Sequence, residues 1–189
     1  MTSIRAGARL ELRPLPPAAA AALATDRDAA ATLLGATLPP DWPQDDLRDI
    51  LPILAAANPL SAGFGAWVIV ERDTNTVVGD AGFLGPPGED GSVEVGYSVL
   101  PDRRRRGYAT EAVAALVGWA LARDEVREVI AHCDPDNVGS IRVLEVTGFR
   151  RTGAVDGQLT WSLGLAADAG SSGRSRSSGA PGPARSSDA

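Results

Sequence analysis

One basic, glycine-containing segment of the sequence has the residue types and spacing of an anion-binding site. Four consecutive arginines at residues 103–106 are followed by Gly107, Ala109 and Thr110 at the start of a predicted helix. The first turn of a helix presents backbone N–H groups without intrahelical partners, together with the positive end of the helix dipole. Because glycine lets a ligand approach the backbone and arginine binds phosphate oxygens in pairs, the segment predicts a pyrophosphate site.

The composition narrows the class of ligand and of chemistry. The chain has 189 residues and a formal net charge of −6, and all 18 of its basic residues are arginine. Without lysine, Schiff-base chemistry and a phosphate-loop lysine are excluded, and the glycine spacing matches neither the dinucleotide nor the mononucleotide fingerprint. The acidic balance argues against nucleic acid or an anionic membrane as a partner. A run of arginines taken alone is equally consistent with a solvated turn.

The single cysteine stands beside a histidine at the end of a predicted strand. Adjacent strand residues point to opposite faces, so His132 and Cys133 are not expected to share a proton as a nucleophilic pair. We interpret Cys133 as a residue of the core or of a cleft wall, and one cysteine allows no internal disulfide. The sequence contains no cluster with metal-ligand spacing, so we expect no metal site.

The elements that position these residues follow from hydrophobic periodicity and turn signals. Val113, Leu116 and Val117 recur at helical spacing, which predicts one apolar stripe on a helix. The predicted strands are residues 10–13, 66–71, 77–84, 92–99 and 127–133, and a last hairpin covers residues 149–165. The predicted helices are residues 18–23, 28–34, 44–57, 108–122 and 138–147, and Pro52 should kink or interrupt the third. This order predicts a mixed α/β domain around one central sheet.

The chain length suits one domain, which we place at residues 10–165. Residues 1–9 are expected to form a flexible N-terminus. Residues 166–189 are rich in serine, glycine, proline and alanine and contain no large apolar side chain, so we expect a disordered tail. No apolar run of transmembrane length and no secretory signal is present, which predicts a cytoplasmic protein. The sequence leaves open whether it is a monomer or a homodimer.

The residues around the arginine run resemble the GNAT superfamily of acyl-CoA-dependent N-acyltransferases. Residues 104–109 match its Arg/Gln-x-x-Gly-x-Gly/Ala motif, residues 93–101 its fourth strand, and residues 137–149 its Asn-x-x-Ser/Ala helix that ends in Gly-Phe. Within the superfamily, Gly96-Tyr97 and residues 108–112 are most similar to the ribosomal-protein N-terminal acetyltransferase (Rim-type) branch, which also includes enzymes that act on small amines. The resemblance implies a mostly antiparallel sheet, splayed between its fourth and fifth strands and flanked by helices.

The resemblance also implies an enzyme that transfers an acetyl group from acetyl-CoA to a primary amine, by direct attack in a ternary complex. It assigns pantetheine binding to the free edge of the fourth strand near Ser98 and Val99. It assigns pyrophosphate binding to the loop residues Arg104, Arg105, Arg106, Gly107, Tyr108, Ala109 and Thr110. Asn137 would contact the pantetheine or the acceptor side, or alternatively only cap its helix.

The resemblance gives candidates for catalysis too, each with a plainer alternative. Glu94 is the candidate general base, or else a solvent-facing strand residue. Leu144 occupies the position of the tyrosine that acts as general acid in many relatives, so Ser140 is the substitute, unless it is only a capping or surface residue. Trp42 would contact the acceptor from an N-terminal lid, or else belong to the core.

Nearby carboxylates suggest what the acceptor is. The presumed lid carries Asp41, Asp45, Asp46 and Asp49, which favour a cationic acceptor by electrostatic attraction. The alternative function is a catalytically weak acyl-CoA-binding sensor or scaffold domain, motivated by the missing tyrosine.

Overall fold

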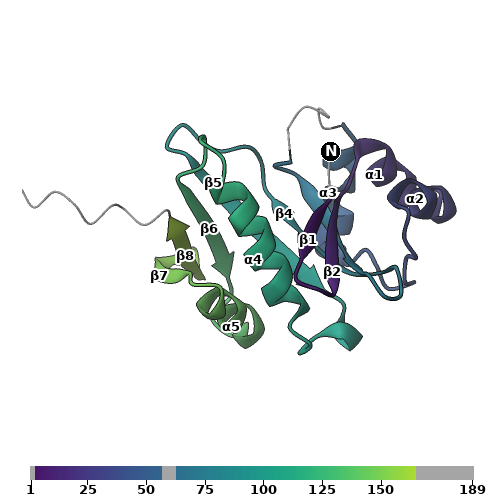
Figure 1. The fold of residues 1–189 in the computed structure, drawn as a ribbon. Coiled ribbons are helices and arrows are strands. Elements are labelled where there is room, and N and C mark those ends of the chain that lie inside the picture. Colours follow the sequence, from purple (N-terminus) through teal and green to yellow (C-terminus); the bar gives the residue numbers. More distant parts are fainter. Residues whose placement is uncertain (1–2, 57–62, 165–189) are drawn as a thin grey trace, which may run out of the picture.

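The computed structural model describes residues 3–56 and 63–164, which form one mixed sheet with helices on both faces (Figure 1). The strand order is β1-β2-β3-β4-β5-β6-β8-β7. The strands are β1 (Ile4–Ala6), β2 (Leu10–Pro14), β3 (Ala66–Glu71), β4 (Thr76–Phe83), β5 (Ser92–Val99), β6 (Glu128–Cys133), β7 (Arg150–Val155) and β8 (Gln158–Gly164). The helices are α1 (Pro17–Leu23), α2 (Arg27–Leu34), α3 (Asp45–Ala56), η1 (Pro101–Arg103, a 3-10 turn), α4 (Tyr108–Leu121) and α5 (Val138–Val146). The predicted mixed α/β fold class is confirmed.

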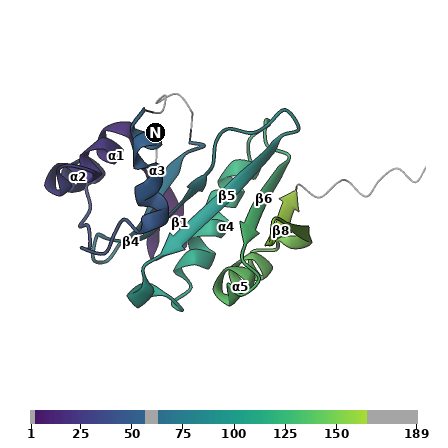
Figure 2. The ribbon, with the colours of Figure 1, turned by 180° about the vertical axis from the view of Figure 1, so that it is seen from behind.

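Alternating side chains of β3 divide the core into two layers. Trp67 and Ile69 belong to an apolar cluster on the face that α4 covers, whereas Val68 and Val70 belong to a second cluster under α1, α2 and α3. Successive strand residues point to opposite faces, so this run of apolar residues is buried on both sides of the sheet. In the ribbon, α4 crosses one face (Figure 1) and α3 lies against the other (Figure 2).

Helix α4 confirms the apolar stripe predicted for residues 108–122. It buries Val113, Leu116 and Val117 in the cluster that it shares with the sheet. Burying a large aliphatic side chain stabilises the fold by about 1.5–3 kcal/mol. The stripe therefore holds the N-terminal end of α4, and the arginine loop before it, in a defined place beside β5.

The sheet opens between β5 and β6. Strand β5 contains the residues that match the fourth strand of the family, so this is the opening between the fourth and fifth strands that the resemblance implies. These two strands pair in parallel, but only Ser92, Val93 and Glu94 have partners on β6, the last pair being Glu94 with Ile130. Beyond that point β5 continues to pair with β4 as far as Val99. One edge of β5 is therefore unpaired within the described residues, next to the loop that leads into α4.

The structure corrects two predictions about local structure. Residues 1–9 are predicted to be flexible, whereas Ile4–Ala6 form β1, which pairs with β2 because Ala6 is buried in the core. Pro52 is predicted to kink or interrupt its helix; the predicted interruption is wrong, because α3 continues through this residue. Leu47 and Leu51 are buried against the second cluster, and this packing keeps the helix intact despite the missing N–H. The predicted disordered tail lies outside the described residues.

Candidate active site

The loop between β5 and α4 exposes backbone donors. Arg105 and Gly107 adopt positive φ angles of 61° and 81°, and Gly107 is the N-cap of α4 without any side-chain capping bond. The first intrahelical bond runs from the N–H of Glu111 to the carbonyl of Gly107. The N–H groups of the three residues between, which open the helix, are therefore available to an anion. Left-handed backbone of this kind turns neighbouring N–H groups toward one side of the loop.

Two of the four arginines support the loop itself. Arg104 donates from Nε to the carbonyl of Val99 at 2.9 Å, and Arg106 donates from Nη2 to the carbonyl of Asp102 at 3.1 Å. Arg105 makes no hydrogen bond to the residues that the structure describes and lines the cavity below. Of the three predicted arginine ligands, Arg105 is therefore the one whose side chain is not already engaged by the loop.

The side chain of Tyr108 anchors the loop from the core side. It is buried, and its hydroxyl donates to Glu71 of β3, which also forms an ion pair with Arg103. The bond from Tyr108 lowers the pKa of Glu71 and, for the same reason, raises the pKa of the tyrosine. Arg9 donates to the carbonyl of Arg106 and so also holds the loop. The side chain of Tyr108 thus belongs to the fold, whereas its backbone N–H is one of the three at the start of α4 without an intrahelical partner.

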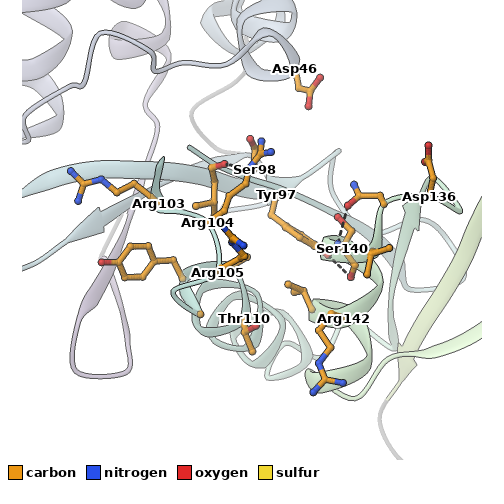
Figure 3. Close-up of a pocket in the computed structure, with 18 residues that line it drawn as sticks. Asp46, Tyr97, Ser98, Arg103, Arg104, Arg105, Thr110, Asp136, Ser140 and Arg142 are labelled. Atoms are coloured by element: carbon orange, nitrogen blue, oxygen red, sulfur yellow. Dashed lines mark hydrogen bonds between the residues drawn. The ribbon is translucent and has the colours of Figure 1, made fainter. Parts of the chain in front are cut away.

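A cavity of about 730 Å³ lies where the arginine loop, the end of β5 and the start of α5 meet (Figure 3). Its lining includes most of the residues predicted from the sequence: Ser98, Val99, Arg104, Arg105, Gly107, Tyr108, Ala109, Thr110, Asn137 and Ser140. Arg106, Glu94 and Trp42 are not in the lining. Asp46 of α3 and Arg142 of α5 line it as well, and the sequence motifs assign no cavity role to Arg142.

The backbone of β5 presents alternate residues to the opening. Glu94 accepts from the N–H of Leu84, and Leu100 donates to the carbonyl of Val78, so even-numbered residues of β5 pair with β4. The N–H groups of Tyr97 and Val99 therefore face the opening. The side chain of Ser98 lies on the face of the sheet that carries α3, where its hydroxyl donates to Gln44 at 2.6 Å.

Helix α5 starts with a side-chain cap that reaches the cavity. Asn137 accepts the N–H of Ser140 at 3.0 Å, and the carbonyl of Ser140 accepts the hydroxyl of Tyr97 at 3.2 Å (Figure 3). Burial raises the pKa of Tyr97 to about 12, so its phenol stays protonated. Leu144 is fully buried one turn further on. Sequence reasoning did not select Tyr97 as a site residue, although the Gly96-Tyr97 pair was a usable signal.

Glu94 forms a pair that the sequence does not reveal. Its Oε1 lies 2.8 Å from Nδ1 of His132 on β6. Cys133, the neighbour of that histidine, is buried on the opposite face in the cluster under α4. The prediction that His132 and Cys133 face opposite sides is therefore confirmed, and the histidine has a carboxylate partner instead.

The structure places Trp42 in the core and not at an acceptor site. Its side chain is fully buried, and its indole N–H donates to Oδ2 of Asp80 on β4 at 2.8 Å. Burial raises the pKa of Asp80 to about 6, and the bond from Trp42 partly opposes this shift. Trp42 is not exposed to an acceptor, because the apolar side chains of α1, α2 and α3 enclose it.

Residues 3–56 and 63–164 contain neither a cluster of metal-ligating side chains nor a membrane-spanning helix. No three or more His, Cys, Asp or Glu side chains gather there as they would around a metal ion. None of the helices in that part of the chain is long and apolar enough to cross a membrane.

A mixed sheet that opens beside the uncapped start of a helix is the architecture of the acyl-CoA N-acyltransferases that the sequence resembles. Residues 9–150 match the family model described as "Acetyltransferase (GNAT) domain". The chain therefore belongs to the GNAT acetyltransferase family, which makes it an N-acetyltransferase.

The chain is also similar to individual acetyltransferases. The uncharacterized N-acetyltransferase YjdG of Bacillus subtilis is 39% identical over 112 residues, which are 58% of this chain and 67% of that protein. Other curated relatives match over about half of their own length. An acetyltransferase structure from Agrobacterium tumefaciens is 26% identical with a TM-score of 0.60, covering 87% of this chain and 95% of that one. Mycobacterium smegmatis RimJ in complex with CoA-disulfide is 24% identical with a TM-score of 0.59, covering 86% of each chain.

Proposed function

We propose that this protein transfers the acetyl group of acetyl-CoA to a primary amine, either a protein N-terminus or a small-molecule amine, by direct attack in a ternary complex. The cavity of about 730 Å³ carries the proposal, because its lining joins the arginine loop, the free edge of β5 and the first turn of α5. If acetyl-CoA lies along the arginine loop and the free edge of β5, its thioester end lies beside the first turn of α5. Holding both reactants in one place removes much of the entropic barrier to their reaction.

The donor binds through the loop and the strand edge. The N–H groups of Tyr108, Ala109 and Thr110 and the side chain of Arg105 hold the pyrophosphate, since all of them line the cavity. Arg104 and Arg106 keep the loop in shape through their bonds to backbone carbonyls. The N–H groups of Tyr97 and Val99 on the open edge of β5 pair with the pantetheine arm, and one of them faces the thioester oxygen as an oxyanion donor. Asn137 lines the same cavity at the start of α5.

The chemistry needs one base and one acid. A primary amine is mostly protonated at neutral pH, so Glu94 takes one proton from the ammonium before the nitrogen attacks. The new C–N bond forms as the C–S bond breaks, and the nitrogen then loses its second proton. This proton passes to the thiolate of coenzyme A, relayed by the hydroxyl of Ser140 or by solvent. A thiolate is stable enough near neutral pH to need little help from an acid.

The acceptor is cationic in this proposal. Asp46 lies in the cavity lining. Three neighbouring residues in the sequence, Asp41, Asp45 and Asp49, are exposed. Carboxylates at the mouth of a site raise the local concentration of cations and their rate of entry.

An amine panel tests the proposal. Purified protein is given acetyl-CoA and, one at a time, peptides with different free N-termini and small primary amines. Free thiol is recorded and the products are identified by mass spectrometry. We expect stoichiometric thiol and N-acetyl product with at least one cationic amine. Tight binding of coenzyme A without turnover on any amine would contradict the proposal, and it would favour the sensor or scaffold function suggested by the buried Leu144.

A further inference from the structure

His132 contacts the candidate base across the opening in the sheet. It is the one histidine of the 189 residues, and its Nδ1 lies 2.8 Å from Oε1 of Glu94. The last β5–β6 pair is Glu94 with Ile130, so His132 stands where the two strands have already separated. The side chains of His132 and Glu94 are 26% and 31% exposed, so each of them is partly accessible from solvent.

Strand alternation puts this pair on the acceptor side of the sheet. Glu94 and Ser98 are both even-numbered residues of β5, and Ser98 donates to Gln44, just before α3. On β6, Cys133 belongs to the cluster under α4, so His132 faces away from α4. Opposite His132 on β8 stands Thr160, whose hydroxyl is buried and has no partner among the described residues. A polar row thus runs from β5 over β6 to β8, on the same face of the sheet as α3.

A hydrogen bond from Nδ1–H of His132 to Glu94 would decide which carboxylate oxygen can accept a proton. When one ring nitrogen of a neutral imidazole donates to a carboxylate, that bond sets the tautomer and holds both groups in one orientation. Nδ1–H of His132 then occupies Oε1, and Oε2 keeps its lone pairs. A carboxylate without this bond would sample several rotamers, and each would have to be ordered before proton transfer.

We propose that His132 is the positioning residue of the general base. It donates Nδ1–H to Oε1 of Glu94 and thereby directs Oε2 toward the acceptor ammonium. The N–H bond of the ammonium breaks, an O–H bond forms at Oε2, and the neutral amine attacks the thioester; the proton later leaves to solvent. This inference rests on the proposed acetyl transfer for its kinetic part.

A purely structural role predicts a different outcome. A side-chain pair that is partly exposed contributes little to stability, even where both groups are charged, so replacing His132 should leave the melting temperature nearly unchanged. A loss of rate in a protein of unchanged stability is then a loss of positioning.

The kinetic test uses the amine with the fastest thiol release in the panel and compares replacements of one side chain. We expect Glu94→Ala to lower kcat about 100-fold or more and His132→Ala to lower it about 10-fold, with the KM for acetyl-CoA within about twofold of the wild type. His132→Asn places an amide N–H near the position of Nδ1 and should recover most of kcat, whereas His132→Gln places it near Nε2 and should not. Glu128→Gln, on the same strand as His132, is the matched control and should leave kcat unchanged.

Coupling provides the second kinetic measurement. The double variant Glu94→Ala with His132→Ala should be no slower than Glu94→Ala alone, because His132 acts only through that carboxylate. Fully multiplied effects of the two substitutions, or equal activity of the Asn and Gln replacements, would overturn the proposal.

The pair itself is tested without any acceptor. In protein labelled with ¹⁵N-histidine, the ring signals report His132 alone. We expect the neutral ring to carry its proton on Nδ1 in the wild type and mainly on Nε2 in Glu94→Ala. A wild-type Nε2–H tautomer would overturn the inference even if acetyl transfer is active. Conversely, a panel without turnover would contradict the proposed function, and the positioning role with it, while the Nδ1–H tautomer could still be observed.

Discussion

The indole N–H of Trp42 donates to Oδ2 of Asp80 at 2.8 Å, and both side chains are buried between the N-terminal helices and the sheet. Asp80 pairs in register with Ser98 on β5. Ser98 in turn donates to Gln44, two residues from Trp42. These contacts attach the segment before α3 to the strands that form one wall of the site.

The buried carboxyl of Asp80 predicts a specific pH dependence of stability. Its folded-state pKa of about 6 lies above the ordinary value of 3.8, so its favourable contribution is present below pH 4 and is lost as the pH rises through 6. Asp80→Asn keeps an acceptor for Trp42 without a charge. We expect the variant and the wild type to be equally stable near pH 4, and the variant to be more stable at pH 7.5 by up to about 3 kcal/mol. Urea unfolding between pH 4 and 8 measures this; a difference that does not change with pH would contradict it.

Gly107 is predicted to be required for the shape of the loop. Its φ of 81° is unfavourable for any residue with a Cβ, so Gly107→Ala should destabilise the protein by about 1 kcal/mol and weaken binding of coenzyme A. Gly118→Ala is the matched control, because Gly118 lies in the interior of α4 with open space around its Cβ position. It should stabilise the protein by about 0.5–1 kcal/mol. Thermal unfolding and calorimetric titration with CoA distinguish the two, and similar effects of both substitutions would be evidence against a special loop conformation.

Arg105 is predicted to contribute to donor affinity and not to stability. Arg105→Gln should raise the KM for acetyl-CoA about tenfold, the loss expected for one charged hydrogen bond, and leave the KM for the amine unchanged. The double variant Arg104→Ala with Arg106→Ala should also raise the KM for acetyl-CoA. It should lower the melting temperature as well, because both side chains bind loop carbonyls. Equal changes in the two KM values for Arg105→Gln would remove Arg105 from the pyrophosphate site.

Tyr97 is predicted to act as a hydrogen-bond donor that does not titrate in the working range. Its pKa of about 12 keeps the phenol protonated, so Tyr97→Phe should leave the shape of the kcat profile between pH 6 and 10 unchanged. The carbonyl of Ser140 loses its donor, which should cost about 1 kcal/mol of stability. The pH profile and urea unfolding measure both effects. An alkaline limb that disappears in the variant would show that Tyr97 does titrate.

Asp46 is predicted to attract the acceptor. Because it lines the cavity, Asp46→Asn should raise the KM for a cationic amine several-fold at low salt and less at high salt, where the attraction is screened. Asp49→Asn, an exposed residue of the same helix that is absent from the lining, is the control and should have little effect. Steady-state kinetics at two ionic strengths measure the difference, and a neutral amine should show none.

Local patterns in the sequence were enough to predict the elements around the arginine loop. The stripe on α4, the turn at Gly107 and the cap at Asn137 depend on residues within a few positions of each other, so propensity and spacing determine them. The same holds for the opposite facing of His132 and Cys133, which follows from strand alternation alone. Ser140 lies at the same cavity as the loop although α4 and β6 separate the two in the chain, so local patterns alone do not bring them together.

Contacts between segments that are distant in the sequence depend on the tertiary structure. Glu94 meets His132 from 38 residues away, and Trp42 is enclosed by packing of α1, α2 and α3 although its loop reads as a surface lid. β1 exists because β2 offers it a paired edge, and α3 continues through Pro52 because Leu47 and Leu51 are buried. The sequence by itself indicated which residues could bind a pyrophosphate, and the approximate bounds of the helices and strands other than β1 and η1. Which side chains meet across the open sheet, and which carboxyl is buried enough to hold its proton near pH 6, depends on register and packing over long sequence distances.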